Sequence, residues 1–239
     1  RGASTHVDIA RLSRGEPLAY VIGTQPFLGL TIHLDSYPLI PRPETEWWTE
    51  ALITYIGTRA LHILDLGAGS GAIGLALLKH CPNVRVSFTD IRTDHIALIQ
   101  KNVKGNNLDE SRTDYFVGDV FLPLLGKKFD LIVSNPPYIP NTRTLPSEVV
   151  NFEPSEALFA GSDGLDIIRC IAKDATHHLT EKGEVWIECD IENAVQTQHL
   201  LENRDQLRFV VDQQDAQTRE IAAGPRDGNR ARGRRRGQG

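Results

Sequence analysis

Short apolar runs alternate with longer amphipathic segments over residues 62–211, and this pattern predicts strands that alternate with helices. The predicted strands are His62–Leu66, Arg85–Asp90, Tyr115–Gly118, Phe129–Ser134, Val185–Glu188 and Arg208–Val211, and the predicted helices are 71–80, 93–105, 164–178 and 193–202. Such alternation indicates an α/β fold with a mostly parallel, doubly wound sheet. A weaker last run, Glu220–Ala223, predicts an edge strand that returns antiparallel to its neighbours.

The residues before this region follow a different pattern. Residues 6–14 predict the end of a helix, which Gly15-Glu16-Pro17 breaks. Apolar runs at Phe27–Leu34 and Leu39-Ile40 predict a small hairpin. We expect its turn around Asp35-Ser36, between the two runs.

A further helix and a long loop complete the predicted organisation. Thr45 is a capping residue type, and we expect it to begin a helix that runs to about Ile56. Glu44 and Glu46 suit the positive end of that helix. Residues 140–162 show little periodicity, and a connection of this length inside a compact domain is typical of a binding segment or a lid.

A glycine-rich loop follows the first strand of the α/β region. Ile63-Leu64-Asp65-Leu66 leads into Gly67-Ala68-Gly69-Ser70-Gly71, and a helical run begins at once. Glycines let the backbone turn sharply and approach a ligand closely. Residues 69–74 also match the dinucleotide GxGxxG pattern, and Asp90 lies about 20 residues further on. The loop therefore fits NAD or a smaller adenosine ligand, and in either case Asp90 is placed to accept hydrogen bonds from ribose hydroxyls.

Two acidic positions favour S-adenosylmethionine over NAD. Asp65 stands in the strand before the loop, and a carboxylate there suits a cationic ligand better than a pyrophosphate. Asp119 ends the third strand, where it can accept from an adenine amino group while Val120 packs against the ring. Alone, Asp119 would be an ordinary turn residue, but its place in the series of strand ends favours a ligand contact.

Asn135-Pro136-Pro137-Tyr138 follows the strand Phe129–Ser134, at a sheet edge where ligands bind in such folds. The Asn side chain offers one carbonyl acceptor and one NH₂ donor. The prolines fix two φ angles, and the Tyr supplies a flat ring. Such a segment is suited to hold a planar NH₂-bearing group, although a Pro-rich turn that closes a buried strand is the structural alternative.

With these motifs in order, the chain resembles class I S-adenosylmethionine-dependent methyltransferases, and more closely the release-factor glutamine methyltransferases of the HemK or PrmC family. The closer resemblance rests on three further segments: Gly15-Glu16-Pro17-Leu18-Ala19-Tyr20, Leu39-Ile40-Pro41-Arg42-Pro43-Glu44-Thr45-Glu46 and Asn151-Phe152-Glu153-Pro154. It covers roughly residues 10–224. Gly23-Thr24-Gln25-Pro26-Phe27 is similar to fungal mitochondrial members, so we expect a mitochondrial protein, with a bacterial cytoplasmic one as the alternative.

The resemblance implies a seven-stranded Rossmann-like sheet, preceded by a β-hairpin and a helical N-terminal domain that contacts the release factor. Most of that helical domain has no counterpart here. We expect four parts: the end of the helical domain at 1–20, a hairpin linker at 21–44, the methyltransferase domain at 45–224 and a basic disordered tail at 225–239. The chain contains no methionine, so we expect a fragment or a processed form.

The implied reaction methylates the glutamine side chain of the Gly-Gly-Gln loop of a peptide chain release factor. We assign the Asn135 side-chain oxygen and the Pro136 carbonyl as acceptors for the amide hydrogens, Pro137 as the residue that holds the turn, and Tyr138 as the ring that packs on the amide plane. The cofactor residues are expected to be Asp65, Gly67, Ala68, Gly69, Ser70, Gly71, Asp90, Asp119, Val120 and Asn135. Arg42, Glu44 and Glu46 form either an ion cluster at the helix start or a cover for the methionine moiety.

Charge bears on the choice between functions. The tail at 225–239 carries six Arg and one Asp, a charge of +5, so the rest of the chain carries −10 and the net charge is −5. An acidic body argues against a nucleic-acid adenine N6-methyltransferase, which shares the Asn-Pro-Pro-Tyr segment, and against stable DNA binding. The glycine loop also fits an inactive cofactor-binding scaffold or an NAD oxidoreductase. The tail itself is interpreted as a disordered end or as an arm directed at RNA or the ribosome.

Other residue types point to few additional sites. Cys81, Cys170 and Cys189 have no CxxC spacing, so we expect reduced thiols and neither a disulfide framework nor a zinc ribbon. We assign no metal site, and we interpret His177 and His178 as surface residues near a helix end. No window reaches the roughly 18 apolar residues of a membrane span. We expect a soluble monomer with no membrane contact.

Overall fold

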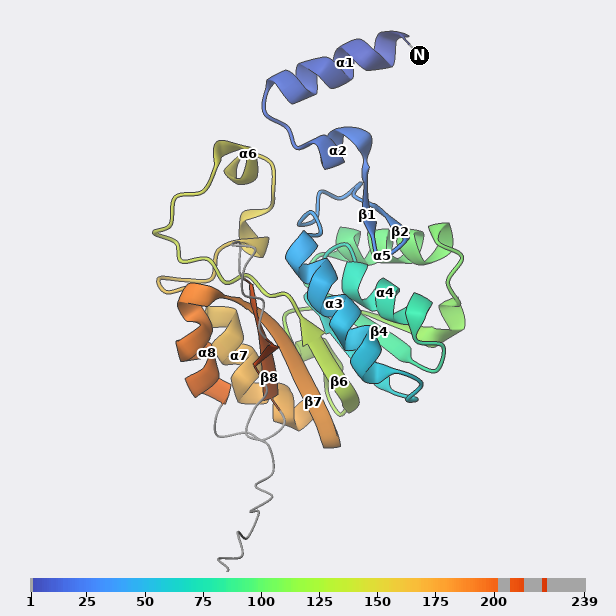
Figure 1. Cartoon of the computed structure of the whole chain (residues 1–239), viewed down its shortest axis with the longest axis vertical. Helices are drawn as coiled ribbons and strands as arrows, with labels where there is room; N and C mark the ends of the chain where they lie inside the picture. The colour runs from blue at the N-terminus through green and yellow to red at the C-terminus, as the bar shows by residue number, and fades with distance from the viewer. Residues whose placement is uncertain (1, 202–206, 213–220, 223–239) are drawn as a thin grey trace, which may run out of the picture.

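Within the residues that the computed structural model describes, 2–201, 207–212 and 221–222, seven strands form one sheet (Figure 1). Their order is β5-β4-β3-β6-β7-β8-β9. Their bounds are β3 His62–Leu66, β4 Arg85–Asp90, β5 Thr113–Val117, β6 Phe129–Ser134, β7 Leu179–Asp190, β8 Leu207–Asp212 and β9 Ile221–Ala222. Neighbours pair in parallel except β8 and β9, which are antiparallel, so the predicted mostly parallel sheet with an antiparallel last strand is confirmed. The tail predicted at 225–239 lies outside the described residues.

Helices cover both faces of the sheet. On one face lie α3 (Pro43–Ile56), α4 (Ala72–His80) and α5 (Thr93–Gly105), and on the other lie α7 (Asp166–Asp174) and α8 (Ala194–Leu201) (Figure 1). Alternate strand residues pack toward opposite faces: Ile63 joins the core under α3 and α4, and Leu64 joins the core under α7. Because central strands are buried on both sides, their sequences are nearly continuous apolar runs, which made them easy to predict.

The hairpin exists, but its predicted position is wrong. Strands β1 (Thr24–Phe27) and β2 (Leu30–His33) pair antiparallel, with Phe27 opposite Leu30. The turn is therefore Leu28-Gly29, whose φ angles of 43° and 73° are left-handed, as two-residue hairpin turns require. Asp35-Ser36 forms a separate turn closed by a hydrogen bond from Tyr37 N to Leu34 O (2.9 Å), and Leu39-Ile40 is not a strand.

Helix α3 begins earlier than predicted. Pro43 occupies its first turn, and Arg42 precedes it in an extended conformation without a side-chain cap. Proline has the φ angle of a helix and needs no hydrogen-bond partner for a missing N–H, so it starts the helix two residues before Thr45. The prediction that Thr45 caps the helix is wrong, because Thr45 lies inside the helix that begins at Pro43. Its hydroxyl donates to Glu188 at 2.8 Å.

The remaining elements lie at the ends of the sheet and in its connections. They are α1 Gly2–Ser13, α2 Leu18–Ile22, η1 Glu110–Arg112, η2 Leu122–Leu124, α6 Ser147–Val150, η3 Ser155–Ala157, η4 Ala175–His178 and η5 Ile191–Asn193. Helix α1 projects away from the sheet at the same end as α6 (Figure 1). Helix α7 is shorter than the predicted 164–178, because the last turn is the separate η4. None of the described helices combines the length and apolar character needed to span a membrane.

Candidate active site

A cavity of about 290 Å³ opens at the carboxyl ends of β3, β4 and β6. Parallel strands of a doubly wound sheet end together there, which is where such folds bind ligands. The cavity brings together most of the predicted site residues: Asp65, Gly67, Ala68, Gly69, Ser70, Asp90, Asp119, Val120, Asn135, Pro136 and Pro137. Gly71 and Tyr138, also predicted, do not line it.

The glycines of the loop have different structural roles. Gly67, Gly69 and Gly71 all have left-handed φ angles, of 68°, 56° and 80°. A Cβ on Gly71 would lie 2.5 Å from Leu75 Cδ1, so this glycine lets helix α4 start close to its own next turn. A Cβ on Gly67 would meet nothing within 4 Å, so its position faces open space in the cavity wall. Gly67 thus permits close approach of a ligand, whereas Gly71 serves packing.

Asp65 is a buried carboxyl at the end of β3. Its side chain accepts a hydrogen bond from Gly74 N at 2.8 Å, and the residue is 1% exposed. Burial raises the pKa of Asp65 to about 7, against the effect of the Gly74 N–H, and the negative charge of Asp90 adds to the rise. A cationic group bound in the cavity would favour the ionised form of Asp65.

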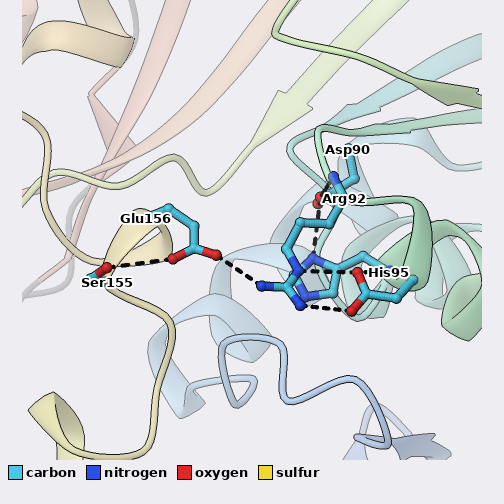
Figure 2. Close-up of polar contacts among 6 residues, drawn as sticks. Asp90, Arg92, His95, Ser155 and Glu156 are labelled. Carbon is cyan, nitrogen blue, oxygen red and sulfur yellow. Dashed lines mark hydrogen bonds and ion pairs between the residues drawn. The ribbon is translucent and has the colours of Figure 1, made fainter.

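Asp90 ends β4 and organises the loop that faces it. Its Oδ2 accepts from Gly69 N at 2.8 Å, and its Oδ1 accepts from Arg92 N at 2.9 Å. His95 Nδ1 lies 3.1 Å from Oδ1 (Figure 2). A carboxylate oxygen can accept more than one hydrogen bond, so Asp90 can serve both the loop and a ribose hydroxyl.

His95 was not predicted as a site residue, although it lines the cavity. His95 is 4% exposed, and its Nε2 is buried without a hydrogen-bond partner among the described residues. A buried polar atom without a partner calls for an explanation, and a bound ligand is one. The available signal was its place in the first turn of the predicted helix 93–105, close after Asp90.

Arg92 connects two sides of the cavity. Its guanidinium contacts Glu156 Oε1 at 3.0 Å and Asp94 Oδ2 at 2.6 Å. Figure 2 shows Arg92 reaching from the Asp90 end of β4 toward Glu156, which belongs to η3 within the 140–162 connection. Both Arg92 and Glu156 line the cavity. The connection that was predicted to be a binding segment or lid therefore forms part of the cavity wall.

Two more arginines form ion pairs that hold this connection. Arg42 Nη2 contacts Glu153 Oε1 at 2.6 Å, and Arg143 pairs with Asp190 at the end of β7. The predicted cluster of Arg42 with its neighbours is wrong, because Arg42 pairs across to Glu153, while the Glu46 carboxylate accepts from Leu28 N at 2.6 Å. The segments 39–46 and 151–154 are thus joined by a buried carboxylate.

Asp119 and Val120 form the wall beyond β5. Val120 has a φ of 43°, which is unusual for a β-branched residue and turns the chain toward η2. The Asp119 carbonyl accepts from Leu122 N at 2.9 Å, while its side chain is exposed. The predicted contact between the Asp119 side chain and an adenine amino group stays a prediction.

Asn135 stands at the carboxyl end of β6. Its Nδ2 donates to Thr45 Oγ1 at 3.1 Å. Pro136 is buried, and the Tyr138 carbonyl accepts from Asn193 Nδ2 at 3.0 Å. The Tyr138 hydroxyl donates to Glu188 Oε1 at 3.2 Å, so this ring is tied to the sheet. The turn is therefore rigid and positions the Asn135 side chain at the cavity.

Glu188 is a further residue that was not predicted from the sequence. It is fully buried on β7, and its Oε2 accepts from Thr45 Oγ1 at 2.8 Å and from Trp48 Nε1 at 2.6 Å. The signal was an acid within the otherwise apolar run Val185–Cys189. Among the residues that the structure covers, no group of three or more His, Cys, Asp or Glu side chains is arranged to hold a metal ion.

Comparison with known proteins adds a family likeness. The methyltransferase small domain matches residues 46–152. The chain is 40% identical over 188 residues to the release factor glutamine methyltransferase of Geobacter sulfurreducens, a match over 78% of this chain and 65% of that protein. It is 34% identical over 207 residues to that of Lactococcus lactis, over 86% of this chain and 75% of that protein. The chain spans slightly less than two thirds of the Geobacter protein and of the Streptococcus pneumoniae relative, 65% and 63%.

A solved structure supports the fold. The ribosomal protein L11 methylase of Lactobacillus delbrueckii is similar to this chain with a TM-score of 0.53 and 20% identity, over 76% of this chain and 77% of that one. At this level of identity, the likeness shows a shared methyltransferase fold.

Proposed function

The chain belongs to the release factor glutamine methyltransferase family, and on this premise we propose that it transfers a methyl group from S-adenosylmethionine to a glutamine side chain. The acceptor is the glutamine of the Gly-Gly-Gln motif of a peptide chain release factor. The observation that carries this proposal is that Asn135 lines the same cavity as the glycine loop. A group that recognises an amide and a loop that admits an adenosine ligand thus share one space.

The residues present fit S-adenosylmethionine. Gly67 leaves open space for close approach, and the buried Asp65 carboxyl suits the ligand's cationic amino acid part. Asp90 would hold the ribose, and Asp119 and Val120 would hold the adenine; Ala68, Gly69 and Ser70 complete the wall. When bound, the cofactor supplies an electrophilic methyl group on sulfonium sulfur.

Asn135 and Pro136 orient the acceptor nitrogen. A primary amide nitrogen is a weak nucleophile, so alignment of nitrogen, methyl carbon and sulfur is the main requirement. The Asn135 side-chain oxygen and the Pro136 carbonyl accept the two amide hydrogens and stabilise positive charge as it develops on nitrogen. Held in this way, the nitrogen would take the methyl group as its bond to sulfonium sulfur breaks, which would leave S-adenosylhomocysteine, and the nitrogen would lose one proton to solvent.

Methylation of a purified release factor tests this function. The protein is incubated with methyl-labelled S-adenosylmethionine and a release factor that carries either Gln or Ala in its Gly-Gly-Gln motif. Label is expected only on the Gln form. Equal labelling of both forms would overturn the glutamine assignment, and methylation of an adenine oligonucleotide instead would establish the nucleic-acid alternative.

Asn135→Ala separates catalysis from cofactor binding. Because Asn135 accepts from the reacting amide, its loss should lower kcat about 100-fold. The Kd for S-adenosylhomocysteine should stay within about threefold, a difference below about 1 kcal/mol. Loss of cofactor binding would show that Asn135 is chiefly a cofactor ligand.

The partner is inferred from the family membership, and the location from the similarity of Gly23-Thr24-Gln25-Pro26-Phe27 to fungal mitochondrial members. We infer a release factor as protein partner, a monomeric enzyme and a mitochondrial location. Size-exclusion chromatography with light scattering tests the oligomeric state, and imaging of the tagged protein tests the location.

A further inference from the structure

The sheet places Glu188 beside Asn135. Strands β6 and β7 are parallel, and Ser134 lies opposite Ile187, so the next residue on each strand is Asn135 and Glu188. Trp186 packs in the core under α3, and Glu188, two residues on, points to the same face. Helix α3 brings Thr45 to this corner, where it also lines the cavity.

The donor and the acceptor of each hydrogen bond in this corner can be assigned. Trp48 Nε1 is a donor only, so Glu188 Oε2 accepts from it, at 2.6 Å. The Thr45 hydroxyl donates to the same oxygen, at 2.8 Å. Thr45 has one hydroxyl hydrogen, which this bond uses, so its oxygen can only accept from Asn135, at 3.1 Å. The side-chain amide of Asn135 must then present its nitrogen to Thr45.

We propose that Glu188, acting through Thr45, fixes the orientation of the Asn135 side-chain amide and leaves its oxygen for the substrate. The opposite orientation of the amide would direct an N–H donor at the substrate amide hydrogens, which an acceptor has to meet. Glu188 and Thr45 are thus positioning residues. The identity of the acceptor amide rests on the proposed function, whereas the orientation of Asn135 does not.

The same carboxylate holds the other side of the turn. Glu188 Oε1 accepts from the Tyr138 hydroxyl at 3.2 Å. Both ends of the Asn135–Tyr138 segment are therefore linked to one fully buried carboxyl group. Since burial of a carboxylate is costly unless donors surround it, a positioning role accounts for its presence in an otherwise apolar strand.

Thr45→Val and Thr45→Ser form a matched pair that tests the proposal. Valine has nearly the shape of threonine but lacks the hydroxyl, so the Asn135 amide is no longer held in one orientation. The substrate amide is then poorly aligned, and kcat should fall about 10- to 100-fold. Serine keeps the hydroxyl and should restore kcat to within about threefold of the unsubstituted protein. The Kd for S-adenosylhomocysteine should change less than about threefold in both variants.

Thr49→Val controls for the loss of a buried hydroxyl. Thr49 lies one turn later in α3, is fully buried, and donates to the Thr45 carbonyl at 2.7 Å. It has no place in the proposed catalytic machinery. This variant should keep kcat while showing the stability cost of removing such a hydroxyl. An unchanged kcat in Thr45→Val, or a failure of Thr45→Ser to restore it, would overturn the proposal.

A spectroscopic readout tests the orientation without any substrate. In protein labelled with ¹⁵N-asparagine, the Asn135 side-chain NH₂ signal is assigned by its loss in Asn135→Asp. Thr45→Val should shift this signal and accelerate its hydrogen exchange, whereas Thr49→Val should not. An unaltered signal in Thr45→Val would overturn the proposal. If the unsubstituted protein does not methylate a release factor, the proposed function fails, and the NMR result still decides the role of Thr45 and Glu188.

Discussion

Cofactor affinity should depend on pH through Asp65. Burial raises the pKa of Asp65 to about 7, so the free protein carries this carboxyl mostly protonated at pH 5 and about half ionised at pH 7. A cationic ligand beside Asp65 favours the ionised form and lowers its pKa in the complex. The ligand therefore binds more tightly as pH rises toward 7, and the gain levels off above that pH.

The magnitude follows from the ionised fraction. With a pKa of about 7, about 1% of Asp65 is ionised at pH 5 and about 50% at pH 7, so affinity should rise roughly 50-fold if the pKa in the complex lies below about 5. The α-amino group of the ligand stays protonated over this range, since such groups have a pKa near about 8. Binding at pH 6 should accordingly release close to one proton.

Isothermal titration of S-adenosylhomocysteine measures both quantities. Titrations from pH 5 to 7 give the affinity, and repetition in buffers of different ionisation enthalpy gives the number of protons released. Asp65→Asn keeps an acceptor for the Gly74 N–H but cannot ionise, so its affinity should vary far less over this range. Every other ionisable group is present in both proteins, so parallel pH curves would refute the role of Asp65.

Two further predictions concern the glycine loop and the ion pair between Arg92 and Glu156. Gly67→Ala puts a Cβ into open space at a left-handed φ, so it should cost only about 1 kcal/mol of stability and yet weaken cofactor binding more than about tenfold. Gly71→Ala adds a contact at 2.5 Å to Leu75 and should cost about 2–4 kcal/mol of stability. Thermal unfolding should therefore give Gly71→Ala the lower melting temperature of the two variants, and equal melting temperatures would refute the separate roles of the two glycines. Glu156→Gln breaks the partly exposed ion pair with Arg92 and should raise the cofactor Kd about two- to fivefold with little change in stability. That difference should shrink in about 0.5 M salt, and a salt-independent effect would contradict an ion-pair origin.

The sheet was predictable because its signals are local. Central parallel strands are buried on both faces, so each appears as one apolar run, and the helices between them follow directly. The ends of these strands then meet at one edge, which is why Asp65, Asp90 and Asn135 could be placed together from the sequence. The glycine loop carried its own signal in the spacing of its residues.

The contacts that orient the site were not predictable because they are distant in sequence. Thr45 and Glu188 are separated by 143 residues, and Asn135 and Thr45 by 90. Local pattern assigned Thr45 to a helix cap, but the helix begins at Pro43 and Thr45 lies inside it. The hairpin turn was misplaced for a related reason: Asp35-Ser36 is a turn by composition, but the left-handed Leu28-Gly29 pair sets the register.

The most direct test of the central claim is to locate the transferred methyl group on a release factor by mass spectrometry. The reaction uses the unsubstituted protein, S-adenosylmethionine and an unmethylated release factor, with Asn135→Ala as the matched inactive protein. We predict one methyl group on the glutamine nitrogen of the Gly-Gly-Gln motif and almost none with Asn135→Ala. A methyl group on another residue, or equal transfer by Asn135→Ala, would contradict the proposal that this cavity presents a glutamine amide to the methyl donor.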